Sequence, residues 1–184
     1  MSPTEALDFL KKHISNQNLI KHSLAVEAVM KELADYFDQD REKWALAGLL
    51  HDIDYEETKD KPNEHSLMGA EILMKANIDK EICQAVKVHN EMHGILPKTL
   101  MEKALYLADP LTGLIVAATL VLPSKKINDL TVENILNRFR EKAFARGVNR
   151  EIIKKSKELL DLELEEFLAI GLRAMQKISD QLGL

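Results

Sequence analysis

Apolar residues recur every three or four positions along most of this chain, which is the spacing that places them on one face of an α-helix. The pattern is clear from Leu19 to Phe37, where it predicts a helix to about Tyr36 that also carries His22. No run alternates apolar and polar residues convincingly enough to predict a strand. The pattern therefore predicts an all-α fold.

Capping residues, glycines and prolines divide the rest of the pattern into helices. The segment Ser2-Pro3-Thr4-Glu5 has the features of a helix start and predicts a helix to about His13. Asp40 can cap a helix so apolar that it should cross the centre of the core and end at His51-Asp52. Further helices are predicted over about 67–73 and 79–94, from Thr99 onward, and over about 131–144, 149–160 and 164–182.

Two segments are expected to interrupt the helices. The polar stretch 54–63 contains Pro62 and is typical of a loop. Because proline lacks an amide donor and clashes with the preceding turn, we expect a kink or break at Asp109-Pro110. The whole length, residues 1–184, fits one domain.

The composition is that of a globular protein with no strong attraction to polyanions. Apolar residues make up 46% of the chain and charged residues 30%, and the net charge is -5. This balance disfavours binding to bulk nucleic acid. No apolar stretch approaches the roughly 20 residues of a membrane span, so we expect no membrane association and a cytoplasmic location. The single cysteine, Cys83, is expected to be a small buried hydrophobe.

Histidines and aspartates stand at the apolar faces of several predicted helices. His51 and Asp52 lie at the buried end of the core helix, where polar groups require partners. A lone histidine on such a face more often packs as a core imidazole that donates to a backbone carbonyl. Several together favour a shared site. The further candidates are His22, His65, His89 and Asp109.

The order and context of these residues resemble the HD-domain superfamily. The residues that carry the resemblance are His22, the segment 48–54 around His51-Asp52, the segment 105–109 that ends in Asp109, and the histidine segments 64–73 and 86–89. The last two are similar to the extra histidine segments of the binuclear branch. The resemblance implies a helical HD bundle with a metal-binding core over about 19–117 and additional C-terminal helices over about 131–182.

The resemblance also implies which residues hold metal. His22, His51, Asp52 and Asp109 would hold one ion, and Asp52 would bridge to a second ion held by His65 and His89. Nitrogen and oxygen ligands without a thiolate suit divalent transition metals. Among these we favour manganese or iron, with cobalt, nickel and zinc as alternatives.

Two divalent ions that share Asp52 would lower the pKa of a bridging water and make hydroxide available to attack phosphorus. The same ions would neutralise the phosphoryl oxygens and position the ester. The predicted function is therefore a phosphatase or phosphodiesterase acting on a nucleotide or a related small phosphorylated metabolite. The apolar stripe over 164–178 is core or the interface of a homodimer.

The chain departs from the family pattern just after the His-Asp pair. Related sequences place a glycine and a lysine after the isoleucine, whereas this chain has Asp54 and Tyr55, so a cation that would face phosphate is missing. Asp54 is a candidate for catalysis beside Asp52, as a proton shuttle or as a hydrogen-bond partner of a metal ligand, and a solvated loop carboxylate is the alternative. Candidates for phosphate contacts, with solvated charge as their alternative, are Lys125, Lys126 and Arg146.

Two other functions stay open on the sequence alone. Some binuclear HD proteins use two irons to activate dioxygen, and their ligands barely differ from those of the hydrolases. The missing cation also allows a non-catalytic nucleotide-binding sensor that keeps the HD fold.

Overall fold

The computed structural model describes residues 1–141 and 143–184, and every regular element in those residues is helical. The prediction of an all-α fold is therefore confirmed. The first elements are α1 (Pro3–His13), α2 (Gln17–Tyr36), α3 (Arg41–Leu50), α4 (Tyr55–Thr58), α5 (Leu67–Lys75), α6 (Lys80–Val88) and the 3₁₀ turn η1 (Glu91–His93). They are followed by α7 (Leu100–Leu120), η2 (Ile127–Asp129), α8 (Val132–Arg140), α9 (Arg150–Ile153), α10 (Ser156–Leu160), α11 (Leu164–Gln176) and α12 (Ser179–Leu182).

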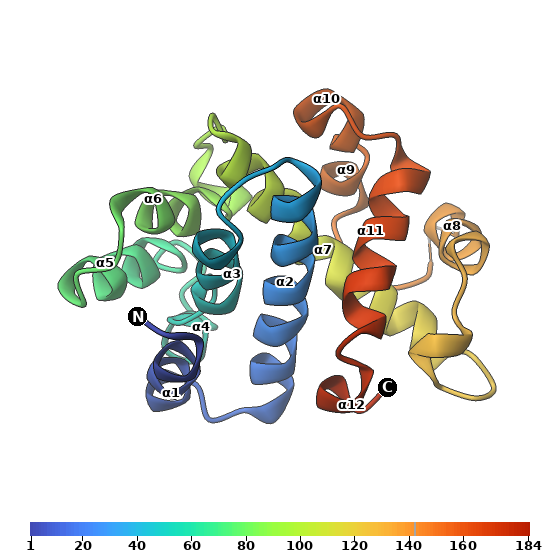
Figure 1. Cartoon of the computed structure of the whole chain (residues 1–184), viewed down its shortest axis with the longest axis horizontal. Coiled ribbons are helices and arrows are strands. Elements are labelled where there is room, and N and C mark those ends of the chain that lie inside the picture. The colour runs from blue at the N-terminus through green and yellow to red at the C-terminus, as the bar shows by residue number, and fades with distance from the viewer. Residues whose placement is uncertain (142) are drawn as a thin grey trace.

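The helix α7 is the centre of the fold (Figure 1). It contacts α2, α3 and α6 on one side and α8 to α11 on the other. A capping box between Thr99 and Glu102 begins it. By length and composition α7 could cross a membrane, yet 61% of its most apolar window is buried inside the fold. We therefore describe α7 as the core helix of a bundle.

The close packing of α2 against α3 depends on Gly48. A Cβ atom on this glycine would lie 2.9 Å from the Cα atom of Glu27 and 2.9 Å from the carbonyl oxygen of Val26. Real Cβ contacts are never so short, so only glycine allows the two helices to approach this closely. The approach matters for the site because α2 carries His22 and α3 ends next to His51.

Of the kink or break expected at Asp109-Pro110, the break is wrong, and the kink stays a prediction. The helix α7 continues through Pro110 to Leu120. An interior proline costs roughly 3 kcal/mol, but burial against neighbouring helices supplies most of the stability of a helix in a protein. After the proline, the hydroxyl of Thr112 donates to the carbonyl oxygen of Asp109 at 3.0 Å, which strengthens that turn.

Several predicted boundaries differ from the structure. The expected loop over 54–63 includes one helical turn, α4, and the predicted helix 131–144 ends at Arg140. Position 142 of that prediction lies outside the described residues. The guanidinium of Arg150 donates to the carbonyls of Glu141 and Phe144, which lie beyond the end of α8.

The two last predicted helices are each divided in two. The range 149–160 contains α9 and α10, and the range 164–182 contains α11 and α12. Between α9 and α10 the amide of Lys155 bonds to the carbonyl of Ile152, which tightens the chain and interrupts the α-helical pattern. The interruption before α12 has the same form, because the amide of Ile178 bonds to the carbonyl of Met175.

The C-terminal helices pack onto the rest of the bundle. In Figure 1 α11 runs beside α2, and it also contacts α7 and α8. The stripe predicted as core or dimer interface is largely core, since Phe167, Leu168, Leu172 and Met175 are buried within the chain. The homodimer and the domain boundaries stay predictions.

Candidate metal centre

The structure brings the six predicted ligands together from five parts of the chain. His22 lies on α2, His51 and Asp52 directly follow α3, and Asp109 lies in the middle of α7. His65 precedes α5 and His89 follows α6. Each side chain reaches the same region because these helix ends and faces converge on α7. The cluster is therefore a product of tertiary packing.

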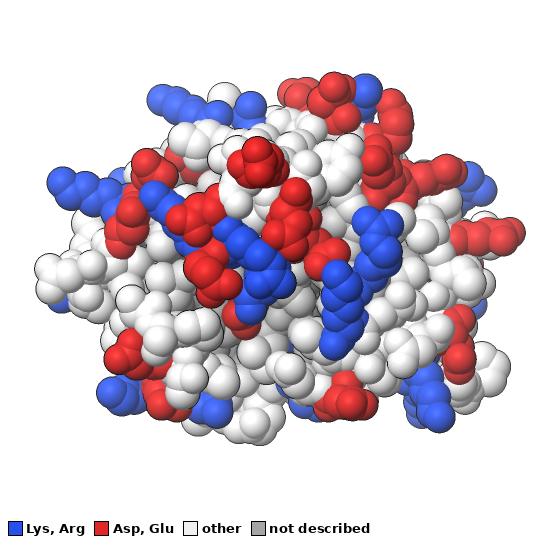
Figure 2. All heavy atoms as spheres, in the orientation of Figure 1, with Lys and Arg blue, Asp and Glu red and all other residues white. Residues whose placement is uncertain are grey.

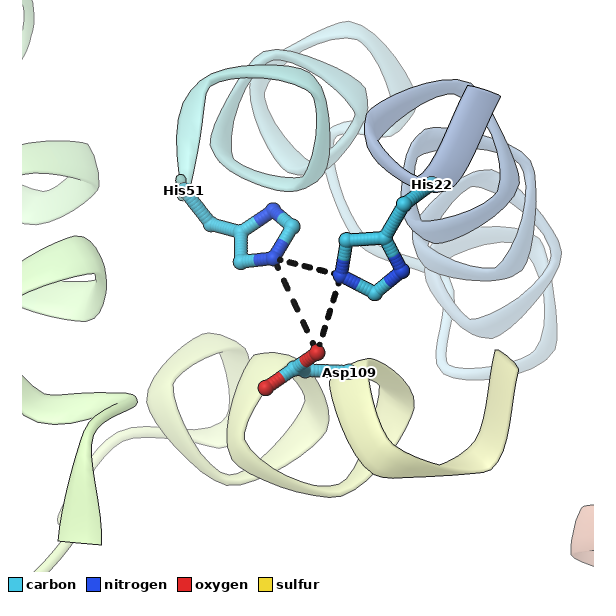
Figure 3. Close-up of side chains that lie close together, drawn as sticks. All are labelled: His22, His51 and Asp109. Atoms are coloured by element: carbon cyan, nitrogen blue, oxygen red, sulfur yellow. Dashed lines mark hydrogen bonds and ion pairs between the residues drawn. The ribbon is translucent and has the colours of Figure 1, made fainter. Parts of the chain in front are cut away.

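Three of the six form a compact group, which Figure 3 shows between α2, the end of α3 and α7. The Nε2 atom of His22 lies 3.2 Å from the Nε2 atom of His51 and 3.0 Å from Oδ1 of Asp109. The Nε2 atom of His51 lies 3.8 Å from the same carboxylate oxygen. The two rings and the carboxylate thus point toward one another.

Asp52 stands between this group and the other two histidines. Its Oδ2 atom lies 3.6 Å from Nε2 of His22 and 3.4 Å from Nε2 of His51. Its Oδ1 atom lies 3.4 Å from Nε2 of His65 and 3.4 Å from Nε2 of His89. His51, Asp52 and His89 form a second group whose ligand atoms all lie within 4.8 Å of one another. The two carboxylate oxygens of Asp52 therefore face two different sets of imidazoles.

Each of the four histidines is oriented by a hydrogen bond at Nδ1. The acceptors are the carbonyl of Gly48 for His51, the carbonyl of Val86 for His89, the carboxylate of Asp54 for His65 and the hydroxyl of Thr112 for His22. A carbonyl or carboxylate oxygen only accepts, and the hydroxyl of Thr112 already donates to the carbonyl of Asp109, so each Nδ1 atom carries the hydrogen. The Nε2 atom is then free to offer its lone pair to the cluster, as in a histidine that binds metal.

Asp54 is buried and holds the segment that carries His65. Its Oδ2 atom accepts from the backbone amides of Ser66 at 2.8 Å and Gly69 at 2.9 Å, and its Oδ1 atom lies 3.1 Å from Nδ1 of His65. The alternative of a solvated loop carboxylate is therefore wrong, because Asp54 is fully inaccessible to solvent. A side chain at position 69 would press on this carboxylate, since its Cβ would lie 3.1 Å from Oδ1.

We expect Asp54→Asn to weaken metal binding at His65 by roughly 10- to 100-fold, the usual cost of losing an outer partner of a metal ligand. An amide has one accepting oxygen, and its amino group would face amide donors. Metal titration calorimetry measures the effect. The matched control is Asp60→Asn, which changes an exposed carboxylate in the same segment. Equal affinities in the two variants would contradict the orienting role.

The carboxylates and the imidazoles shift each other's pKa values. Burial disfavours the charged form of His51, but Asp52 and Asp109 raise its pKa well above the ordinary value. Burial acts in the same sense on His65, and Asp52 and Asp54 raise its pKa to about 9. The pKa values of Asp52 and Asp109 are lowered despite burial, because the neighbouring imidazoles favour the carboxylate form. Without metal, protonated imidazoles therefore balance the buried carboxylates.

Metal binding is therefore expected to release protons and to strengthen as the pH rises toward about 9. The pKa of His65 is about 9 in the folded chain against an ordinary 6.5. Protonated His65 therefore stabilises the metal-free fold fully below pH 6.5, and this stabilisation is lost as the pH rises through about 9. The lowered pKa values of Asp52 and Asp109 act oppositely: their stabilising effect is present above pH 3.8 and lost as the pH falls through the lowered values. Calorimetry in buffers of different ionisation enthalpy counts the protons. Proton-neutral binding between pH 6.5 and 9 would contradict this arrangement.

A cavity of about 320 Å³ opens beside the cluster. The predicted ligands His22, His65, His89 and Asp109 line it, together with a ring of polar residues. That ring comprises Asn90, Glu91, Tyr106 and Asn149. Asn149 donates to Oε1 of Glu91 at 2.7 Å and so links the C-terminal helices to the end of α6. Sequence reasoning missed this ring, whose only signal is that Asn149 precedes a helix it can cap.

The two lysines and the arginine predicted to contact phosphate are not among the residues that line the cavity. Lys125 and Lys126 are exposed just before η2 and do not line the cavity. Arg146 is exposed one residue before Gly147, which does line it. Among the residues that border this cavity in the described part of the chain, none is a lysine or arginine. Their contact with phosphate stays a prediction.

The chain is similar to a known protein family and to several proteins of known name. Residues 19–114, just over half of the chain, match the model of the HD domain. The chain belongs to the HD-domain family. This HD domain is 32% identical to ribonuclease Y of Lawsonia intracellularis over 139 residues, covering 74% of this chain and 26% of that protein. Ribonuclease Y of Nitratidesulfovibrio vulgaris is 34% identical over 142 residues, 74% of this chain and 27% of that protein.

A second kind of relative is also found. A tRNA (cytidine(56)-2'-O)-methyltransferase of Picrophilus torridus is 32% identical over 124 residues, covering 60% of this chain and 36% of that protein. The HD domain thus spans about a quarter of the ribonuclease Y relatives and about a third of this methyltransferase. No solved structure matches the chain.

The donor set of this HD domain fits a metal ion. Four imidazole nitrogens and two aspartates converge without a thiolate, and each imidazole is held by a bond at its far nitrogen. Such a set suits manganese, iron, cobalt, nickel or zinc. The family and the geometry together support a His/Asp cluster that can hold metal.

Proposed function

We propose that this HD domain is a metal-dependent phosphohydrolase and that the six residues hold two ions. The observation that carries the proposal is the position of Asp52, whose two oxygens face His22 and His51 on one side and His65 and His89 on the other. When bound, divalent ions supply a water of lowered pKa and neutralise phosphoryl charge. The membership in the HD family supports the same activity.

The residues of the chain contribute by holding the ligands in place before substrate arrives. Hydrogen bonds from the Nδ1 atoms to oxygens of Gly48, Val86, Asp54 and Thr112 fix the four imidazoles, so little reorganisation is needed when metal binds. His51 and Asp54 are fully buried, which keeps water away from these bonds. Glu91 and Asn149 line the cavity together with the proposed ligands, so a substrate in the cavity would contact both the cluster and these polar side chains.

We further propose that the substrate is a small phosphorylated metabolite such as a nucleotide. The cavity of about 320 Å³ supports this size. The net charge of -5 gives no general attraction to a polyanion, and on the face in Figure 2 basic side chains are interspersed with acidic ones. Because the relatives include proteins named ribonuclease Y, RNA phosphodiesters are the second candidate substrate.

The test is a panel of nucleotides, dinucleotides, cyclic nucleotides and short RNA, assayed with manganese, iron, cobalt, nickel and zinc. We expect turnover of small substrates, with Asp52→Asn as the control for contaminating phosphatases. The metal content per chain, measured after purification without chelator, should approach two. Failure of every substrate with every metal would exclude the proposed activity.

The two alternative functions give different results in the same assays. Turnover that requires dioxygen, with a mixed-valent paramagnetic signal from two irons, would favour the oxygenase. Tight nucleotide binding without turnover by metal-replete protein would favour the sensor module.

We expect Tyr55→Lys to improve the KM for phosphorylated substrates more than kcat. The ring of Tyr55 packs edge-on against His65, with the centroids 5.3 Å apart, so position 55 lies beside a proposed ligand. A lysine there would add a cation that contacts phosphate in the ground state. Steady-state kinetics measures both parameters, and Tyr55→Phe controls for the loss of the hydroxyl. If neither parameter changes, position 55 does not face the phosphate.

A further inference from the structure

One face of α7 borders two cavities that share lining residues beside the metal centre. Tyr106, Asp109 and Gly113 line the cavity of about 320 Å³, and Gly113, Val116 and Leu120 line a second cavity of about 550 Å³. Spacings of three and four residues place all of them on one side of the helix. Gly113 borders both cavities, as does the proposed ligand His22 on α2. The two cavities are therefore adjacent and share these two lining residues, and we call the two cavities together the groove.

The two halves of this groove differ in chemistry. We call the half lined by Glu91, Tyr106 and Asn149 the polar arm. Asn149 donates to Oε1 of Glu91, and Oε2 of this carboxylate accepts no hydrogen bond within the described residues. This free oxygen can accept from hydroxyl groups of a ligand.

We call the other half the apolar arm, after Val116, Leu120 and Leu184. Leu120 is 50% exposed, so half of this apolar side chain is available to contact a ligand in the cavity. Among the described residues that line this arm, Lys21 is the one lysine or arginine, and it precedes His22 on α2. An apolar substituent seated there would cover Leu120, and the ammonium group of Lys21 would remain at the edge of the arm for a phosphate oxygen.

We propose that this groove binds a phosphodiester with two unlike substituents, a hydroxyl-bearing group in the polar arm and an apolar group in the apolar arm. The inference rests on the proposed function, because the cluster must receive the phosphate between the arms. A monoester has one substituent and would leave one arm empty. A second phosphate in the polar arm would meet the carboxylate of Glu91 without a lysine or arginine among the described lining residues.

The reaction that follows is an ordinary hydrolysis. The oxygen of water forms a bond to phosphorus, and one ester P–O bond breaks. The leaving oxygen takes a proton that originates from the water. The products are one phosphomonoester and one alcohol, and no oxidant or further reactant is needed.

Three chromogenic substrates test the groove. They are thymidine 5'-(p-nitrophenyl) phosphate, which is a mixed diester, bis(p-nitrophenyl) phosphate and the monoester p-nitrophenyl phosphate. We expect the highest kcat/KM for the mixed diester. Because the esters differ in intrinsic reactivity, affinities for the metal-loaded protein are also compared, as Kd values from calorimetry for compounds that are not turned over and as competitive inhibition constants for those that are. The mixed diester should bind about 10-fold more tightly than thymidine 5'-monophosphate, since only the diester places an aryl group in the apolar arm.

Leu120→Asp tests the apolar arm. Leu120 is half-exposed, so the variant should fold. We expect the preference for the mixed diester over thymidine 5'-monophosphate to fall about 10-fold, because a carboxylate would replace the apolar wall. The matched control is Val121→Asp, since Val121 is the next residue, is also 50% exposed and does not line the arm. Equal preferences in the two variants would overturn the assignment of the apolar arm.

Gly113 tests whether the two arms are connected. A Cβ on this glycine would lie 3.4 Å from Cγ2 of Val148, an ordinary contact, so Gly113→Ala is tolerated. The longer side chain of Gly113→Leu would fill the junction, and the preference for the mixed diester should be lost in this variant but kept in Gly113→Ala. If both variants keep it, the groove is not continuous.

These outcomes separate the groove from the proposed function. If no ester is hydrolysed but the binding preferences follow the variants, the groove stands and the hydrolase proposal fails. If esters are hydrolysed and the monoester is bound and cleaved as well as the mixed diester, the hydrolase stands and the groove proposal fails.

Discussion

The variant Asp52→Asn is expected to lose both metal ions and to have activity reduced by more than the roughly 10- to 100-fold that the loss of an outer partner costs. Asp52 is the residue whose two oxygens face both sets of imidazoles. Without the negative charge of Asp52, two cations at adjacent sites would repel each other and lose a shared ligand, so neither should stay bound. The side chain keeps its size, so the effect reports charge and not a cavity.

Two histidines that are proposed to bind one ion without bridging, His65 and His89, provide the contrast to Asp52. His65→Ala and His89→Ala should each keep about one equivalent of metal and stay folded, because His22, His51 and Asp109 form a separate group. Both variants should lose most of their activity. His13→Ala is the control, since this histidine packs on Phe9 and belongs neither to the candidate metal groups nor to the lining of the cavity beside them. Metal analysis per chain and kcat/KM are the measurements. Wild-type metal content and activity in both histidine variants would show that the site holds one ion.

Removing the metal is expected to lower the melting temperature by about 8–16 °C. The ligands come from five parts of the chain, so ions that bind only the folded state stabilise it by about 4 kcal/mol when free metal exceeds the Kd 1,000-fold. In a domain of this size each 1 kcal/mol shifts the midpoint by about 2–4 °C. Differential scanning calorimetry before and after chelation measures the shift.

A matched variant shows whether the shift comes from the site. Asp52→Asn should melt at the same temperature with and without chelator, because it has no ions to lose. Restoring metal to the chelated parent protein should restore its midpoint. An unchanged midpoint after verified metal removal would contradict a metal centre that joins the helices.

Local patterns in the sequence were sufficient for most of the helices. The capping box at Ser2 and the cap at Asp40 begin helices where predicted, because a cap depends on residues three positions apart. The wrong predictions involve contacts that lie farther away. Pro110 remains inside α7 because neighbouring helices bury that helix on two sides. The helix expected over 131–144 ends early where Arg150 binds the carbonyls that precede it.

The identity of the six candidate ligands could also be predicted from the sequence, because the order and flanking residues of the motif identify the family. The contacts that orient these ligands and surround them could not be predicted from the sequence. The orienting role of Asp54 depends on amides at Ser66 and Gly69, which fold back over it. The link between Glu91 and Asn149 joins residues 58 positions apart.

The sequence by itself determined the helical class, the family and the residue types available to a metal, since these follow from spacing and local chemistry. Only the tertiary structure decided which oxygen of Asp52 faces which histidine, what surrounds Asp54, and that one face of α7 runs past the cluster. The physical reason is that such contacts join segments distant in the chain. Their geometry depends on how closely the helices pack, and at Gly48 that distance is set by the absence of a single side chain.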